Sequence, residues 1–240
     1  MSLEEVFEYC AELGFDAVDP TGYYFPGYPD PPPDEFIYQI RRKAFVLGLD
    51  ISGTGVRNNF AAAENPAADI DHVKKWVEVA EKMGAPTVRV FAGEASVGHS
   101  EDEVSRWLVD SLKTCAEYGK QHGIMIGLQP HHDFLKTAAQ VLDVLERVDS
   151  EWVGLNLDVG SLRAGDPYEE IALLAPHAIT WQIKDSVYRK GNEERADLSR
   201  IVEIVRQSGY RGYLPLETLG PESAQNLPAF LNEVRQALNR

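Results

Sequence analysis

The chain has 240 residues, of which 44% are hydrophobic and 25% charged, and its formal net charge is -15. This composition is typical of a folded globular protein, and the length suits one α/β barrel domain spanning residues 1–240. The negative charge repels phosphate backbones, which argues against nucleic acid as a partner. The sequence has no run of eighteen apolar residues and no signal-peptide pattern at its N-terminus. We therefore expect a cytoplasmic protein that does not contact a membrane.

Helical periodicity alternates with short apolar runs along the whole chain. Helices are predicted over residues 3–13, 34–47, 70–83, 101–122, 136–147, 167–175, 197–208 and 224–238. Strands are predicted over residues 16–19, 49–54, 87–93, 124–129, 153–158, 179–185 and 213–217. Strand followed by helix, repeated, predicts a parallel sheet with right-handed crossovers.

The pattern gives eight helices but seven strands, and the chain opens on a helix. The predicted fold is therefore a (β/α)8-type TIM barrel without its first strand. Either that strand was lost upstream of Met1, or the sheet is not a full barrel. A doubly wound open sheet is the alternative, although no GxGxxG turn follows any strand. A missing strand would leave an unpaired edge, which favours a homo-oligomer.

Side-chain alternation separates an apolar face from a polar face in five of the predicted strands. In residues 153–158, Val153, Leu155 and Leu157 share one face, opposite Gly154, Asn156 and Asp158. The polar face of a barrel strand points inward, and its last side chains meet at the C-terminal mouth. The polar and charged residues predicted on this face are Arg89, Gln129, Asn156, Asp158, Gln182, Lys184 and Glu217. A buried charged cluster of this kind is typical of a functional site.

Five segments resemble the xylose isomerase-like barrel family, which includes sugar isomerases, epimerases and endonuclease IV. They are ELGFDAVD (12–19), GLQPHHDF (127–134), LNLDVGSLRAGDP (155–167), ITWQIKDS (179–186) and SGYRGYLPLE (208–217). Their order and spacing cover nearly the whole chain, from Leu3 to Leu238.

The resemblance implies a candidate metal site at four strand ends. The family uses Glu, Asp, His and Glu to bind one divalent cation, and both Glu also serve as acid and base. The matching positions here are Gln129, Asp158, Gln182 and Glu217, and Ser161 replaces a further family His. Two carboxylates and two amides suit Mg²⁺, Mn²⁺ or Ca²⁺ rather than Zn²⁺. Alternatively, the amides have replaced ligands in a site that lost its metal, and they now hydrogen-bond sugar hydroxyls.

Residues near the mouth are the candidates for catalysis and substrate binding. We expect Glu217 to act as a base, with Lys184 stabilising an oxyanion or forming an ion pair with Asp158 or Glu217. His131 is a candidate catalytic residue, and either it or His132 would replace the missing imidazole unless both only cap the next helix.

The predicted substrate-binding residues lie on several different strands and loops. Arg57 follows the second predicted strand, where it would clamp a phosphate or carboxylate, or form a structural salt bridge. The other three substrate-binding candidates are Arg89, His132 and Asn156.

These residues favour a sugar or sugar-phosphate isomerase or epimerase that abstracts a proton next to a carbonyl. Two alternatives stay open: a lyase or hydratase acting on oxidised glycosides, and a carbohydrate-binding barrel without catalysis. A DNA-repair endonuclease of the same family is disfavoured, because it needs a multi-histidine zinc cluster and a basic surface.

Overall fold

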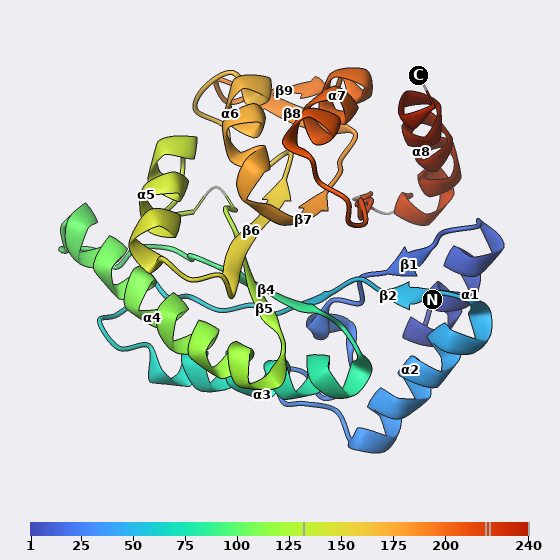
Figure 1. The fold of residues 1–240 in the computed structure, drawn as a ribbon, viewed down its shortest axis with the longest axis horizontal. Coiled ribbons are helices and arrows are strands. Elements are labelled where there is room, and N and C mark those ends of the chain that lie inside the picture. The colour runs from blue at the N-terminus through green and yellow to red at the C-terminus, as the bar shows by residue number, and fades with distance from the viewer. Residues whose placement is uncertain (132, 219, 221, 240) are drawn as a thin grey trace. The chain divides into compact units, whose positions relative to one another are not determined.

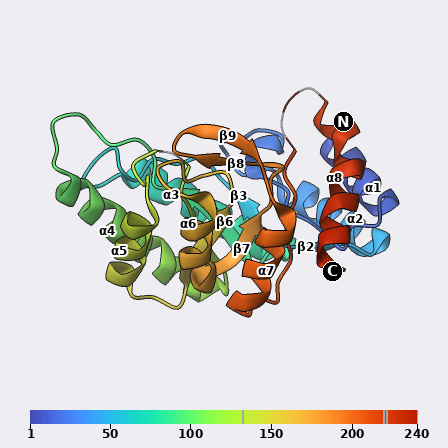
Figure 2. The same cartoon turned by 90° about the horizontal axis from the view of Figure 1, so that it is seen from above.

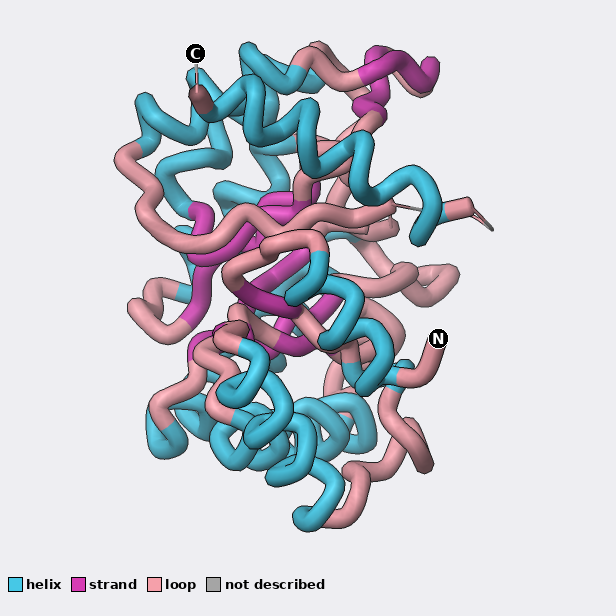
Figure 3. Tube along the Cα trace, turned by 90° about the vertical axis from the view of Figure 1, so that its right-hand side faces the viewer, coloured by secondary structure: helices cyan, strands magenta, loops and turns pink. Residues whose placement is uncertain are grey.

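The computed structural model describes residues 1–131, 133–218, 220 and 222–239. Their contacts form two compact units, which are described separately below. The first unit is Met1–Leu128 with Val144–Gly154, and the second is Gln129–Asp143 with Leu155–Arg240. Helices and loops make up most of the trace, and the strands are short (Figure 3). No helix in the described ranges is both long and apolar enough to cross a membrane.

Helices and strands alternate along the chain, close to the predicted boundaries. The first half contains α1 (Leu3–Glu12), β1 (Ala17–Val18), the 3-10 helix η1 (Gly22–Tyr24), α2 (Asp34–Leu47), β2 (Asp50–Ile51), β3 (Thr54–Gly55), α3 (Ala67–Met83), β4 (Thr87–Phe91), α4 (Glu101–His122) and β5 (Met125–Gln129). The second half contains α5 (Ala138–Val148), β6 (Val153–Asp158), α6 (Pro167–Leu174), the 3-10 helix η2 (Ala175–His177), β7 (Ala178–Gln182), β8 (Ser186–Arg189), β9 (Asn192–Arg195), α7 (Leu198–Ser208) and α8 (Ser223–Leu238).

The central sheet has the strand order β3-β4-β5-β6-β7. Strands β3 and β4 pair in parallel, as do β6 and β7, where Asp158 at the end of β6 lies opposite Gln182 at the end of β7. Strands β1 and β2 form a separate parallel pair. Parallel neighbours joined by helices are the arrangement that the alternating sequence pattern predicts.

Local sequence signals explain where the helices begin and end. Ser2 and Ser100 each form a capping box with the glutamate three residues later, which satisfies free N–H groups at the starts of α1 and α4. Four helices are followed by a left-handed glycine with φ between 70° and 84°, namely Gly48, Gly84, Gly123 and Gly209. These caps are the reason that the predicted boundaries lie within about three residues of the observed ones.

Each unit has its own apolar core. In the first unit α3 packs beside α4 (Figure 1), with Trp76, Leu108 and Leu112 fully buried. In the second unit α6 and α7 are neighbours, and Trp181 of β7 is fully buried on the apolar face predicted for that strand. Burial of these large side chains supplies most of the stabilising free energy in such units.

A β-hairpin that the sequence pattern does not predict follows β7. Strands β8 and β9 lie side by side and antiparallel (Figure 2), joined by Lys190 and Gly191 with φ of 48° and 82°. Positive φ at both turn residues is typical of a type I′ hairpin. Lys-Gly is a weaker signal for this turn than Asn-Gly, and the strands are polar, so periodicity alone misses the hairpin.

Two predicted strands differ in the structure. The run 49–54 is divided into β2 and β3, which join different sheets, with Ser52 and Gly53 between them. Gly53 has no room for a side chain, because a Cβ atom at this position would lie 2.6 Å from Thr87 Oγ1. The run 213–217 forms one isolated bridge, between Leu216 and Ile183, since Pro215 has no N–H group to donate.

Candidate active site

The second unit brings several predicted site residues together where its strands end. Gln129, Asp158 and Gln182 are the last residues of β5, β6 and β7. Lys184 follows β7 by two residues, and Glu217 lies in the extended segment beside it. Side chains from separate strands therefore meet at one edge, as strand alternation predicts for a parallel sheet.

Asp158 is the centre of this cluster and is fully buried. Its Oδ1 accepts a 2.8 Å hydrogen bond from the Gly160 N–H. Its Oδ2 accepts hydrogen bonds of 2.7 Å from Gln129 Nε2 and 2.7 Å from Lys184 Nζ. These partners compensate the cost of burying a carboxylate, and they leave Asp158 no free role as a base.

Lys184 forms ion pairs with both carboxylates. Its Nζ lies 2.7 Å from Asp158 Oδ2 and 2.9 Å from Glu217 Oε2, and the side chain is 13% exposed. Burial alone would lower the pKa of Lys184, but the negative charges of Asp158 and Glu217 outweigh burial and raise this pKa above its usual value. Lys184 is therefore a fixed cation at neutral pH, and it pairs with both carboxylates where the sequence analysis named them as alternatives.

Glu217 is held by its backbone rather than by a regular strand. Its N–H donates to the Ile183 carbonyl over 2.9 Å, and the Ile183 N–H donates to the Pro215 carbonyl over 2.8 Å. The side chain is 29% exposed. Although Oε2 lies 2.9 Å from Lys184, it accepts no hydrogen bond of good geometry from the described residues. This carboxylate oxygen thus has capacity to accept a hydrogen bond.

Two buried oxygen atoms beside Asp158 lack partners within the described part of the chain. They are Gln129 Oε1 and Ser161 Oγ, and both residues are buried. Buried polar atoms are nearly always hydrogen-bonded, so atoms left open in a cluster indicate a place for water or a ligand hydroxyl.

The remaining predicted residues of this unit are less closely joined to the cluster. Gln182 lies opposite Asp158 in the strand register, and Asn156 is buried on β6 opposite Thr180. His131 is exposed on the loop after β5. His132 lies outside the described residues.

Arg57 and Arg89 belong to the first unit, where both stack on Tyr23. The Arg57 guanidinium is 4.8 Å from the centre of the Tyr23 ring, and that of Arg89 is 5.8 Å from it. Arg89 is buried and donates to the Val56 carbonyl over 2.7 Å. Asp19, which directly follows β1, was missed by the sequence analysis; burial raises its pKa to about 6, although the Arg89 charge lowers it.

Among the described residues, the side chains of this cluster do not fit a tightly bound divalent cation. The Lys184 ammonium already pairs with Asp158 and Glu217, the two carboxylates of the candidate ligand set, and halves their combined negative charge. No group of three His, Cys, Asp or Glu side chains suited to a metal occurs in residues 1–131, 133–218, 220 and 222–239. Two neutral amides cannot restore the charge that a tight Mg²⁺ or Mn²⁺ site requires. The geometry therefore favours the alternative in which the amides bind hydroxyl groups.

The chain is similar in sequence to one family of proteins, and in fold to many solved structures. A family model described as "Xylose isomerase-like TIM barrel" matches residues 7–235. No curated protein matches the chain.

Three solved structures are similar over nearly the whole chain. A xylose isomerase domain protein from Planctomyces limnophilus has a TM-score of 0.81 at 17% identity, covering 96% of this chain and 91% of its own. A 3-keto-D-glucoside 4-epimerase from E. coli has a TM-score of 0.80 at 16% identity, with 98% and 94% covered. A xylose isomerase-like TIM barrel protein from Mycobacterium smegmatis, in complex with magnesium, has a TM-score of 0.76 at 21% identity, with 98% and 89% covered. At these identities the likeness shows the fold, and the predicted TIM barrel is confirmed.

Proposed function

Because the chain belongs to the xylose isomerase-like TIM barrel family, we propose that it is a sugar isomerase whose base is Glu217 and whose oxyanion is stabilised by Lys184. The observation that carries the proposal is the 2.9 Å approach of Lys184 Nζ to Glu217 Oε2. A carboxylate able to take a proton and a cation able to hold the resulting charge lie side by side. The similarity to a 3-keto-D-glucoside 4-epimerase supports a sugar substrate.

The proposed reaction begins with proton transfer from carbon to Glu217. Glu217 removes the proton next to a carbonyl group, the electron pair of the C–H bond forms a C=C double bond, and the π pair of the carbonyl moves onto its oxygen. The Lys184 ammonium donates a hydrogen bond to this oxygen as its charge develops. Gln129 Oε1 accepts a hydrogen bond from a neighbouring hydroxyl group. Glu217 then returns the proton to the adjacent carbon, while the hydroxyl proton of the neighbouring oxygen passes to the first oxygen and a carbonyl forms where the hydroxyl was, which completes an aldose–ketose isomerisation.

The cluster favours isomerisation over epimerisation because Glu217 is the one base proposed among its described residues. Epimerisation needs a proton donor on the opposite face of the carbon, and the family position for the second carboxylate holds Gln129, which cannot carry a proton. Asp158 is occupied by three hydrogen bonds. A single base returns the proton to the face from which it was taken, as isomerisation requires.

The experiment is solvent exchange at carbon. A panel of aldoses and ketoses is incubated with the protein in D₂O and followed by NMR. We expect deuterium at the carbon next to the carbonyl, together with appearance of the isomeric sugar. An aldose that carries a hydrogen-isotope label at C2 should pass part of that label to C1, because the same base removes the isotope from C2 and returns it at C1. If no sugar exchanges, the protein binds carbohydrate without catalysis; if an unsaturated product accumulates, it is a lyase, and either outcome rejects isomerisation.

A further inference from the structure

A cavity in the second unit opens beside the Lys184 ammonium. Its volume is about 280 Å³, and its lining includes Gly160, Arg163, Lys184, Tyr188, Thr218 and Asn226. This volume lies near the lower limit for small-molecule sites and suits part of a sugar chain. Since Lys184 also contacts Glu217, a molecule in the cavity would lie next to the proposed reacting groups.

Arg163 is the lining residue whose bonding is incomplete. Its guanidinium stacks on the Tyr188 ring at 3.8 Å from the ring centre. Its Nε is buried without a hydrogen-bond partner, and no ion pair joins Arg163 to any carboxylate of the described residues. Burial of an arginine N–H without an acceptor is costly, so the open edge of this guanidinium indicates a missing acceptor.

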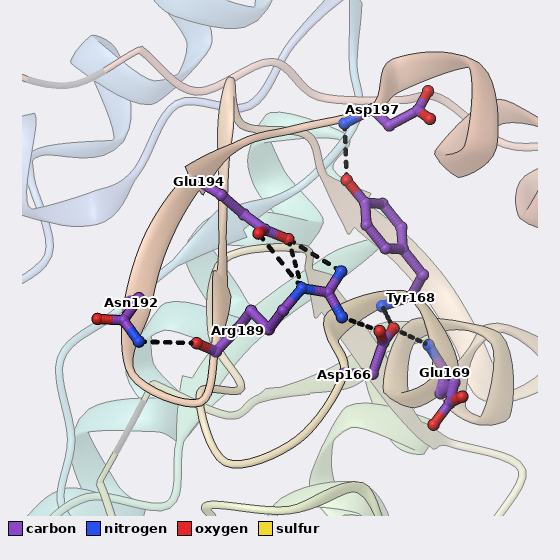
Figure 4. Close-up of polar contacts among 7 residues, drawn as sticks. All are labelled: Asp166, Tyr168, Glu169, Arg189, Asn192, Glu194 and Asp197. Carbon is purple, nitrogen blue, oxygen red and sulfur yellow. Dashed lines mark hydrogen bonds and ion pairs between the residues drawn. The ribbon is translucent and has the colours of Figure 1, made fainter.

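The hairpin β8–β9 holds Arg163 in place. The Gly191 N–H donates to the Arg163 carbonyl over 2.8 Å, and the Lys190 N–H donates to the Gly165 carbonyl over 3.2 Å. Arg189, on the same hairpin, is paired with both Asp166 and Glu194 (Figure 4). The hairpin therefore satisfies one arginine completely and keeps the other oriented but unpaired, which is the arrangement expected of a recognition residue.

We propose that Arg163 binds an anionic group of the substrate, a carboxylate or a phosphate, in the cavity beside Lys184. The inference rests on the proposed function and narrows its substrate class to sugar acids or sugar phosphates. A planar guanidinium offers paired N–H donors that match two oxygens of either group. Asp185 and Glu193 also line the cavity, but both are exposed, so solvent screens their repulsion. Their presence favours the singly charged carboxylate.

The test compares three six-carbon probes by isothermal titration calorimetry: D-gluconate, D-sorbitol 6-phosphate and uncharged D-sorbitol. We expect the wild-type protein to bind gluconate or the phosphate at least about tenfold more tightly than sorbitol, as one charge-assisted hydrogen-bond pair implies. Arg163→Gln should abolish the preference, while Arg163→Lys should keep part of it. The better of the two anionic probes identifies the group.

Arg200→Gln is the matched control. Arg200 stacks on Tyr168 at 4.4 Å in the same unit, outside the cavity lining, so its loss removes the same charge and a similar contact. The preference should survive in this variant. The proposal is overturned if wild-type protein binds the three probes equally, or if Arg163→Gln retains the preference. Binding can be measured without turnover, so the two proposals can fail separately. An anion preference without deuterium exchange would reject only the proposed reaction. Deuterium exchange without an anion preference would reject only the anion site.

Discussion

Gly160 leaves the space through which the Lys184 side chain passes: a Cβ atom on Gly160 would lie 3.1 Å from Lys184 Cδ. That distance is too short for an unstrained contact, and the Lys184 ammonium is fixed by two ion pairs. Gly160 has no positive φ, so alanine is compatible with its backbone. We expect Gly160→Ala to displace the ammonium by a few tenths of an ångström and lower kcat roughly tenfold. Kinetics and thermal unfolding measured together check this, because an unchanged kcat in a stable variant would contradict the tight contact.

Glu217→Gln should lower turnover while substrate binding is retained. The amide keeps the shape of the carboxylate but cannot accept the proton, and losses of a general base cost about 10²–10⁴-fold in rate. Deuterium exchange at carbon should fall by the same factor as isomerisation. The matched control is Glu222→Gln, which removes the same charge from an exposed residue of the same unit. Turnover at the wild-type rate in Glu217→Gln would show that another residue is the base.

Removal of the Lys184 ammonium should convert the cluster into a cation site. In Lys184→Met, Asp158 and Glu217 lose the cation that both of them contact and become available to a divalent cation. We expect wild-type activity to survive EDTA and Lys184→Met to bind Mn²⁺ more tightly than wild type, by calorimetry. Oxyanion stabilisation by the ammonium predicts a loss of about 10²–10³ in kcat for the metal-free variant. Loss of wild-type activity in EDTA would instead indicate a resident metal.

Sequence patterns predict the helices and the position of the cluster because both depend on local rules. The capping serines and terminal glycines define helix ends, and strand alternation places Gln129 and Asp158 on one face. The family resemblance then identifies Glu217 as the candidate base. None of these signals requires knowledge of tertiary contacts.

The features that sequence patterns miss depend on which side chains contact one another in the folded chain. Strand position predicts an ion pair of Lys184 with Asp158 or Glu217, but nothing local indicates that Lys184 contacts both, or that Arg163 stacks on Tyr188. The hairpin itself is polar, and its Lys190-Gly191 turn is a weak signal. Asp19 precedes a proline and resembles an ordinary turn residue, although its carboxyl group is buried near Arg89.

Asp19→Asn should change how stability depends on pH. The pKa of Asp19 is raised from 3.8 to about 6 in the folded protein, chiefly by burial. The folded state therefore binds this proton more tightly than the unfolded state, and stability is lost as the pH rises from about 4 to about 6. At pH 7.5 we expect Asp19→Asn to unfold at a higher urea concentration than wild type. Its free energy of unfolding should be greater by at most about 3 kcal/mol. The gain should disappear near pH 4; a gain of equal size at both pH values would indicate a cause other than ionisation.

Asp166 has two structural roles, as a helix cap and as a member of an ion pair, and substitutions at this position should separate them. Its Oδ1 accepts hydrogen bonds from the Tyr168 and Glu169 N–H groups, over 3.0 Å and 3.2 Å, and so caps α6. Its Oδ2 pairs with Arg189 of the hairpin (Figure 4). Asp166→Asn keeps the capping oxygen and loses the charge, whereas Asp166→Ala loses both.

We expect Asp166→Ala to be destabilised by about 1 kcal/mol more than Asp166→Asn, the typical contribution of an N-cap. The ion pair is partly exposed and screened by solvent, so Asp166→Asn and Arg189→Gln should each cost less stability than loss of the helix cap. Urea unfolding gives these differences, and hydrogen exchange reports the hairpin, where the Lys190 and Gly191 amides should exchange faster in all three variants. Because these two amides hold the Arg163 loop, faster exchange should accompany weaker gluconate binding. Faster exchange with unchanged binding would mean that the hairpin does not position Arg163.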